Sequence, residues 1–200
     1  MAEHRARRVE LDPADYDAQW ARLAAAGHDP HGEATRVEAL LATVVEPRRR
    51  ARVLDAGCGT GRVAIRLAER GARTVGVDLD TDLLARAATK APTCEWVAAD
   101  LATLRDDEIP GPFDAVVAAG NVMIFVAPGT EAAVVGNLAA RLVPGGLLVC
   151  GFQLRGPLTL DRYDAIAVDA GLAPVTRDAT WEGAPYTGGD YVVTVDRVTG

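Results

Sequence analysis

The chain contains the sequence Val53-Leu54-Asp55-Ala56-Gly57-Cys58-Gly59-Thr60-Gly61-Arg62, in which a short apolar run ends in a carboxylate and passes through three alternating glycines. An amphipathic segment follows. Glycine is needed where the backbone takes a positive φ or where a ligand must touch the main chain. Three glycines between a strand and a helix therefore predict a ligand-facing turn whose amide groups are free to donate to the ligand.

A second carboxylate supports a nucleotide-containing ligand. Asp78 ends the next apolar run, where the second strand of a βαβ unit places an acid against a ribose. The glycine spacing disfavours a dinucleotide, because the dinucleotide fingerprint needs a glycine at the position of Arg62. The Tyr-x-x-x-Lys pair of short-chain reductases is also missing, so an NAD-dependent oxidoreductase is a disfavoured alternative.

The pattern Asp-x-Gly-x-Gly-x-Gly, led by Asp55 and followed by Asp78, resembles the signature of the class I methyltransferases that use S-adenosylmethionine (SAM). The resemblance covers roughly residues 52–198. It implies an α/β fold, namely a three-layer doubly wound sheet of seven mostly parallel strands, with the last strand antiparallel. It also implies SAM as cofactor, S-adenosylhomocysteine as product and methyl transfer as the reaction.

In an open α/β sheet the ligand lies off the carboxyl ends of the strands. The resemblance therefore implies that Asp55 holds the methionine end of SAM, that Asp78 accepts from the ribose hydroxyls, and that Asp100 lies near the adenine amino group. Asp55 could instead cap the glycine turn, and Asp100 could be a helix N-cap. The predicted cofactor-binding residues are Asp55, Gly57, Cys58, Gly59, Gly61, Asp78, Leu79, Asp100, Leu101 and Gly120, with Leu79 and Leu101 enclosing the adenine ring.

The residues beside the expected methyl group are less informative. Relatives that act on amino groups often carry Asn/Asp-Pro-Pro-Tyr/Phe there, whereas this chain continues from Asn121 into Val122 and Met123, so methylation of nucleic-acid bases or glutamine is disfavoured. Asn121 could contact SAM or substrate, or could simply tolerate the left-handed conformation. The candidate catalytic residues are Tyr16, His28, His31 and Asn121. The two histidines could equally be ordinary loop residues, and their loop offers too few ligands for a metal.

Hydrophobic periodicity divides the chain at about residue 50. Residues 1–50 are expected to form a helical lid or cap, with helices near 14–26 and 33–45, and residues 51–200 the SAM-binding core, within one structural domain overall. Tyr16 and Trp20 lie four apart, so they share a helical face, either as core packing or as a mobile lid through about His31. The core is expected to hold helices near 60–70, 81–90, 130–142 and 161–170, and strands near 53–55, 74–77, 93–98, 113–119, 147–152, 172–181 and 191–198.

Composition excludes several other activities. The chain has no serine, so a serine-nucleophile hydrolase is ruled out. Its one lysine, Lys90, follows no glycine-rich loop, so a phosphate-binding Gly-Lys-Ser/Thr loop is missing. Acidic residues outnumber basic ones 28 to 21, which gives a net charge of −7 and repels a polyanion. We therefore interpret the arginines, including the run at 48–50, as solvated surface and expect no nucleic-acid partner.

The remaining expectations concern partners and location. Cys58, Cys94 and Cys150 are odd in number and lie in apolar runs, which indicates free thiols in a reducing compartment. No signal peptide or membrane span is visible, so a cytoplasmic location is expected. We expect a monomer or a homodimer. Short connections in the core favour a small-molecule methyl acceptor. The main alternative is a non-catalytic SAM-binding protein that serves as a sensor or subunit.

Overall fold

The computed structural model describes residues 17, 18, 20, 22, 24–27, 29–46, 49–154 and 158–199. Its helices are α2 (Gly32–Leu41), α3 (Arg62–Glu69), α4 (Thr81–Lys90), α5 (Val122–Phe125), α6 (Glu131–Ala139) and α7 (Leu160–Asp169). Its strands are β1 (Arg52–Ala56), β2 (Arg73–Asp78), β3 (Glu95–Ala98), β4 (Phe113–Ala118), β5 (Leu142–Gln153), β6 (Leu172–Asp178) and β7 (Tyr191–Val198).

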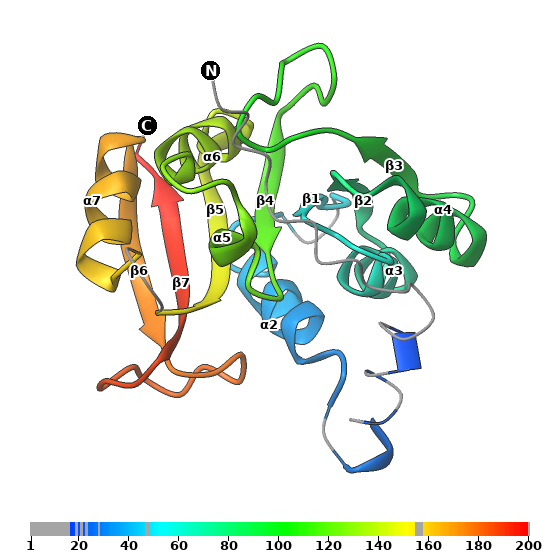
Figure 1. The fold of residues 1–200 in the computed structure, drawn as a ribbon, viewed down its shortest axis with the longest axis horizontal. Coiled ribbons are helices and arrows are strands. Elements are labelled where there is room, and N and C mark those ends of the chain that lie inside the picture. The colour runs from blue at the N-terminus through cyan, green and yellow to red at the C-terminus, as the bar shows by residue number, and fades with distance from the viewer. Residues whose placement is uncertain are drawn as a thin grey trace.

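The seven strands form one sheet in the order β3-β2-β1-β4-β5-β7-β6 (Figure 1). The first five strands pair in parallel, whereas β7 lies antiparallel to both β5 and β6. The predicted doubly wound sheet with an antiparallel last strand is therefore confirmed. The strand order reverses between β1 and β4, where such folds bind their ligands.

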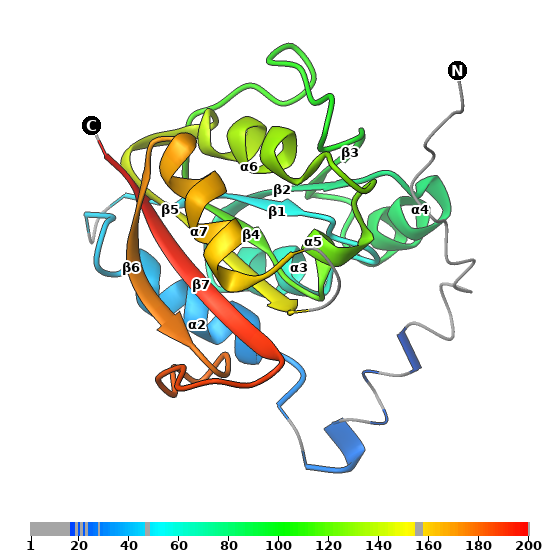
Figure 2. The ribbon, with the colours of Figure 1, turned by 60° about the vertical axis from the view of Figure 1, so that its left-hand side comes forward.

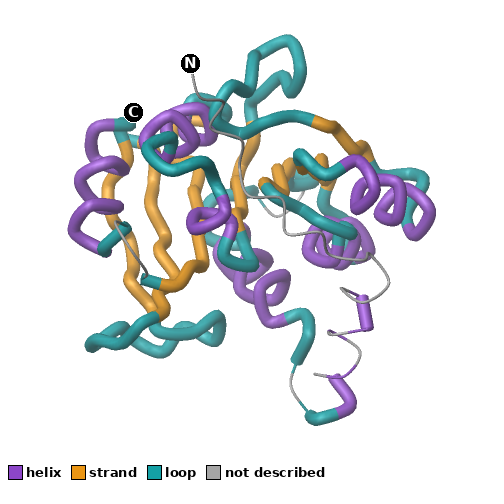
Figure 3. Tube along the Cα trace, viewed as in Figure 1, coloured by secondary structure: helices purple, strands orange, loops and turns teal. Residues whose placement is uncertain are grey.

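Helices cover both faces of the sheet, as Figures 2 and 3 show. Neighbouring residues of β1 point to opposite faces: Val53 belongs to the same buried cluster as residues of α2 and α3, whereas Leu54 belongs to the cluster that includes residues of α6. All residues of β4 are buried, as expected for a central parallel strand. The helix α4 packs beside β2 and β3.

The helix α2 belongs to this core. Its residues Ala34, Val37 and Leu41 are buried in the same cluster as β1, α3 and β4. Part of the predicted N-terminal cap thus covers one face of the sheet, and a boundary near residue 50 stays a prediction. Of the described residues of the other expected helix, 14–26, Ala26 lies in a turn and the rest are helical, namely Asp17, Ala18, Trp20, Arg22, Ala24 and Ala25.

Several element bounds differ from the sequence-based predictions. The strand β5 begins at Leu142 rather than at residue 147, because Leu142 pairs with Phe113 ahead of a register shift. Pro144-Gly145-Gly146 therefore lies inside the strand, and α6 ends at Ala139. The short helix α5 was not predicted. Among the described residues, no helix is long and apolar enough to cross a membrane.

Candidate functional site

The glycine loop is tied to the end of β2 by hydrogen bonds. The strands β1 and β2 are parallel neighbours, so the loop that follows β1 lies beside the carboxyl end of β2. The amides of Gly57 and Cys58 donate to the carbonyl oxygen of Val77 at 2.8 and 2.9 Å. The amide of Gly59 donates to Oδ2 of Asp78 at 2.8 Å. The two motifs found in the sequence therefore meet at one place.

Asp78 is held in a fixed orientation there. Its Oδ1 accepts from the amide of Asp80 at 2.9 Å, so each carboxylate oxygen accepts one backbone hydrogen bond. A carboxylate oxygen can accept two, which leaves an acceptor site on each for a ligand hydroxyl. Burial raises the pKa of the half-buried Asp78, and the two amides partly oppose that rise.

The three loop glycines have the positive φ that their spacing predicts: 71° at Gly57, 54° at Gly59 and 81° at Gly61. Packing adds a second requirement. A Cβ on Gly57 would lie 2.5 Å from a methyl group of Val122, and a Cβ on Gly61 would lie 2.4 Å from the ring of Trp96. The loop therefore accepts no side chain at these two positions without rearrangement.

The expectation that the loop amides are free to donate to a ligand is wrong for four of them. Besides the amides of Gly57, Cys58 and Gly59, the amide of Gly61 donates to the carbonyl oxygen of Cys58 at 2.9 Å. Three of these amides donate to the end of β2 and the fourth donates within the turn, because the loop backbone folds back on β2. What the loop offers a ligand is close approach to the main chain rather than a set of unpaired amides.

Asp55 lies beneath the loop and is 2% exposed. Its Oδ2 accepts from the amide of Ala64 in the first turn of α3 at 2.9 Å. Burial raises its pKa to about 7, and the Ala64 amide and the nearby Arg62 partly oppose that rise. Asp55 thus bonds to the first turn of α3 rather than to the glycine turn itself, and contact of Asp55 with SAM stays a prediction.

The residues predicted to surround adenine follow β2 and β3, which are parallel neighbours. Leu79 is 50% exposed directly after β2, and Leu101 is buried shortly after β3. Asp100 is exposed, and its Oδ1 accepts from the amide of Ala102 at 2.9 Å, as in an N-cap or Asx turn. The fold therefore places these residues at one edge of the sheet.

Gly120 and Asn121 follow β4, across the strand-order reversal from Asp78. Asn121 has a φ of 68°, so the left-handed explanation of this residue is confirmed. Its Oδ1 accepts from the amide of Gln153 at 2.8 Å, which joins the ends of β4 and β5. A Cβ on Gly120 would meet nothing within 4 Å, so this backbone borders open space.

The N-terminal candidates are only partly placed. Tyr16 and His28 lie outside the described residues. His31 precedes α2, where its amide donates to Oδ1 of Asp29 at 2.8 Å, and its side chain lines a separate cavity beside α3.

Sequence reasoning missed two contacts between the N-terminal segment and the loop. The buried hydroxyl of Thr60 donates to Oδ1 of Asp17 at 2.7 Å. The guanidinium group of Arg62 lies 3.7 Å from the centre of the Trp20 ring. The sequence carried one usable signal, since a hydroxyl inside a glycine loop needs a partner once it is buried.

Known proteins resemble the chain in both sequence and structure. A family model described as a methyltransferase domain matches residues 53–146. The crystal structure of a TehB-like SAM-dependent methyltransferase from Corynebacterium glutamicum is similar over 94% of this chain and 98% of that chain. The two have a TM-score of 0.82 and are 31% identical in sequence.

Two curated relatives carry names with different methyl acceptors. A magnesium-protoporphyrin O-methyltransferase of Rhodobacter capsulatus is 32% identical over 122 residues, which are 54% of this chain and 53% of that protein. A ribosomal RNA small subunit methyltransferase C of Chromohalobacter salexigens is 33% identical over 162 residues, which are 72% of this chain and 47% of that protein. The chain thus spans about half the length of the curated relatives it matches.

Proposed function

Because the chain belongs to the class I SAM-dependent methyltransferases, we propose that it transfers the methyl group of SAM to a small-molecule acceptor. The observation that carries this proposal is the pair of amide hydrogen bonds that orients Asp78 beside the glycine loop. Such a carboxylate suits a ribose, because it keeps an acceptor site on each oxygen.

The residues present fit SAM. The positive φ of the loop glycines lets a ligand approach the main chain, and Gly120 borders open space at the end of β4. In the proposed arrangement Asp78 binds the ribose, Leu79 and Leu101 enclose the adenine, and Asp55 supports the loop under the methionine end. When bound, SAM supplies a methyl group already activated by its sulfonium.

The contribution of the protein to the reaction is then mainly alignment. Holding an acceptor in line with the methyl group lowers the activation barrier by up to ~7–11 kcal/mol where the geometry is good. Exclusion of water and a general base can add to this. Asn121 is a candidate for orienting the acceptor, since it lies at the end of β4. Tyr16 and His28 stay candidates in the N-terminal segment, whereas the His31 side chain lines the cavity beside α3.

Two features favour a small acceptor over a macromolecule. The described core, residues 49–154 and 158–199, holds its strands and helices in direct succession, with no further domain inserted among them. The net charge of −7 opposes binding of RNA or DNA. The match to a ribosomal RNA methyltransferase makes the distinction worth testing directly.

The test uses the full chain with SAM that carries a labelled methyl group. A cell extract is separated into small molecules, proteins and total RNA, and each fraction is offered as acceptor. We expect label to enter only the small-molecule fraction, with S-adenosylhomocysteine formed in equal amount. Label in ribosomal RNA would overturn the acceptor class, and cofactor binding without transfer to any fraction would favour a sensor or subunit.

We also propose that the segment through about His31 is a lid that completes the active site. The support is its contact with the loop, where Asp17 accepts from Thr60 and Trp20 covers Arg62. Binding of S-adenosylhomocysteine should then slow amide exchange in this segment. Identical exchange with and without the cofactor product would rule out the lid.

A further inference from the structure

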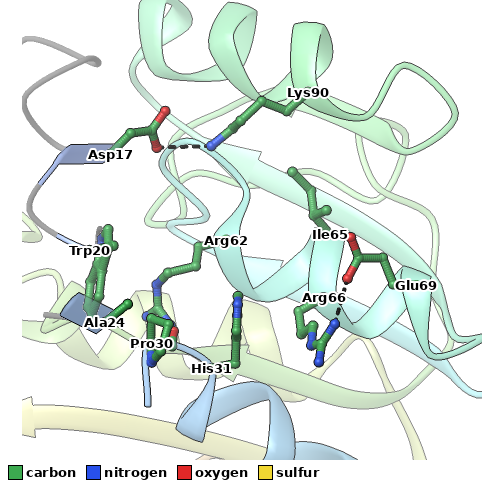
Figure 4. Close-up of a pocket in the computed structure, with 10 residues that line it drawn as sticks. All are labelled: Asp17, Trp20, Ala24, Pro30, His31, Arg62, Ile65, Arg66, Glu69 and Lys90. Carbon is green, nitrogen blue, oxygen red and sulfur yellow. Dashed lines mark hydrogen bonds and ion pairs between the residues drawn. The ribbon is translucent and has the colours of Figure 1, made fainter. Parts of the chain in front are cut away.

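A cavity of about 570 Å³ lies beside the outer face of α3 (Figure 4). The inner face of this helix packs into the core through Val63 and Leu67, whereas Ile65 and Arg66 line the cavity. A volume of this size is typical of sites for small molecules. None of the predicted cofactor-binding residues, all of which are described, lines it. The cavity is therefore separate from the site at the strand ends.

Apolar side chains form part of the cavity lining. Trp20 and Ala24 of the N-terminal segment, Pro30 and Ile65 contribute to it. The Trp20 ring is held against the guanidinium group of Arg62, which in turn pairs with Glu33 at 2.5 Å. The indole is thus fixed as a wall, and an aromatic ring of a ligand can pack against such a surface.

The acidic groups around the cavity are already neutralised. Asp17 accepts from Thr60 and forms ion pairs with Arg86 and Lys90 at 3.1 and 3.0 Å. Glu69 pairs with Arg66 at 2.9 Å. These carboxylates therefore have cations bound to them and do not present an uncompensated negative charge to a ligand.

Three nitrogen atoms of the cavity lining, by contrast, have no hydrogen-bond partner among the described residues. They are the Nε atoms of Arg62 and Arg66 and the Nδ1 atom of His31, all of which are buried. All three side chains line this cavity, and Figure 4 shows the His31 ring between the two arginine side chains. An arginine Nε can only donate, and a buried donor without an acceptor is unfavourable. The site is short of acceptor oxygens.

We propose that this cavity binds a small organic anion with a flat aromatic body, in the class of the aromatic carboxylates. Its ring would pack against Trp20 and Ile65, and its oxygens would accept from Arg62, Arg66 and His31. The ligand is a second molecule rather than the methyl acceptor, because the predicted cofactor residues lie outside the cavity. By joining the N-terminal segment to α3, it would stabilise the contacts of that segment with the glycine loop.

The test is calorimetric titration of the full chain with 1-naphthoate, alongside the neutral analogue 1-naphthalenemethanol. We expect saturable binding of 1-naphthoate and at least fivefold weaker binding of the alcohol. Arg66→Gln removes a donor from the cavity and should weaken 1-naphthoate binding at least fivefold. Arg70→Gln, one turn further along the chain and outside the cavity, is the matched control and should bind as the wild type does. Saturating S-adenosylhomocysteine should not displace the probe.

Three results would overturn the proposal. Absence of saturable binding, or equal binding of the acid and the alcohol, would show that the site does not select an anion. Equal effects of Arg66→Gln and Arg70→Gln would place the probe elsewhere. Displacement by S-adenosylhomocysteine would place it in the cofactor site.

Discussion

Replacement of Asp78 by alanine should weaken binding of S-adenosylhomocysteine by about 10- to 150-fold. The variant loses hydrogen bonds from the ribose to a charged acceptor, which are worth about 1.5–3 kcal/mol. It also releases the amide of Gly59, which Asp78 holds at 2.8 Å, so the loop loses its fixed position. Calorimetric titration of wild type and variant measures the change.

The same substitution should affect folding much less than binding. The pKa of Asp78 is raised, which means that burial disfavours the carboxylate more than its two amide hydrogen bonds favour it. Removal of the side chain relieves the cost of burying the carboxylate, and this gain offsets the loss of the two hydrogen bonds. We therefore expect a fall of no more than ~1 kcal/mol in the free energy of unfolding.

Asp80→Ala is the matched control. Asp80 also accepts two backbone hydrogen bonds, from Asp82 and Leu83, but it does so as the N-cap of α4. Its loss should reduce the free energy of unfolding by ~1 kcal/mol and leave cofactor affinity unchanged. Wild-type affinity in Asp78→Ala, or an equal loss of affinity in both variants, would refute the assignment of Asp78 to the ribose.

Three further predictions follow from the same geometry. Gly61→Val should abolish cofactor binding, because a Cβ there would lie 2.4 Å from the Trp96 ring and the backbone φ is 81°. Titration calorimetry measures the binding, and retained affinity would mean that the loop adapts. The pKa of Asp55 is about 7 in the folded state and near 3.8 in the unfolded state, so the folded state binds more protons between these two pH values. The free energy of unfolding should therefore fall by up to ~4 kcal/mol as the pH rises through that range. Asp55→Asn should remove this pH dependence of the free energy of unfolding, measured by denaturant titrations at several pH values. An unchanged pH dependence would mean that other groups cause it. In a gel shift at physiological salt the chain should not retain DNA or RNA selectively, and sequence-selective retention would contradict the small-molecule assignment.

The parts of the fold that could be predicted depend on signals local in the sequence. The glycine loop, the acid that ends β2 and the hydrophobic face of α3 each lie within a few residues, and each is where the sequence predicts it. The start of β5 was missed because Pro144-Gly145-Gly146 is typical of a turn. Only pairing of Leu142 with Phe113 on another strand keeps that segment extended.

In the candidate site, too, only features with local signals could be predicted from the sequence. Positions at the strand ends follow from the fold class, but hydrogen-bond partners do not. The hydrogen bonds from the loop amides to β2 and the role of Asn121 in joining β4 to β5 depend on contacts between distant segments. The contact of Thr60 with Asp17 spans 43 positions in the chain, which no periodicity reveals.

We propose that SAM binds across the strand-order reversal, with its ribose on Asp78. A crystal structure of the full chain with S-adenosylhomocysteine tests it most directly. We expect both ribose hydroxyls on the Asp78 carboxylate, the adenine between Leu79 and Leu101, and the sulfur atom facing Gly120. A ligand bound elsewhere, or a ribose that does not contact Asp78, would contradict it.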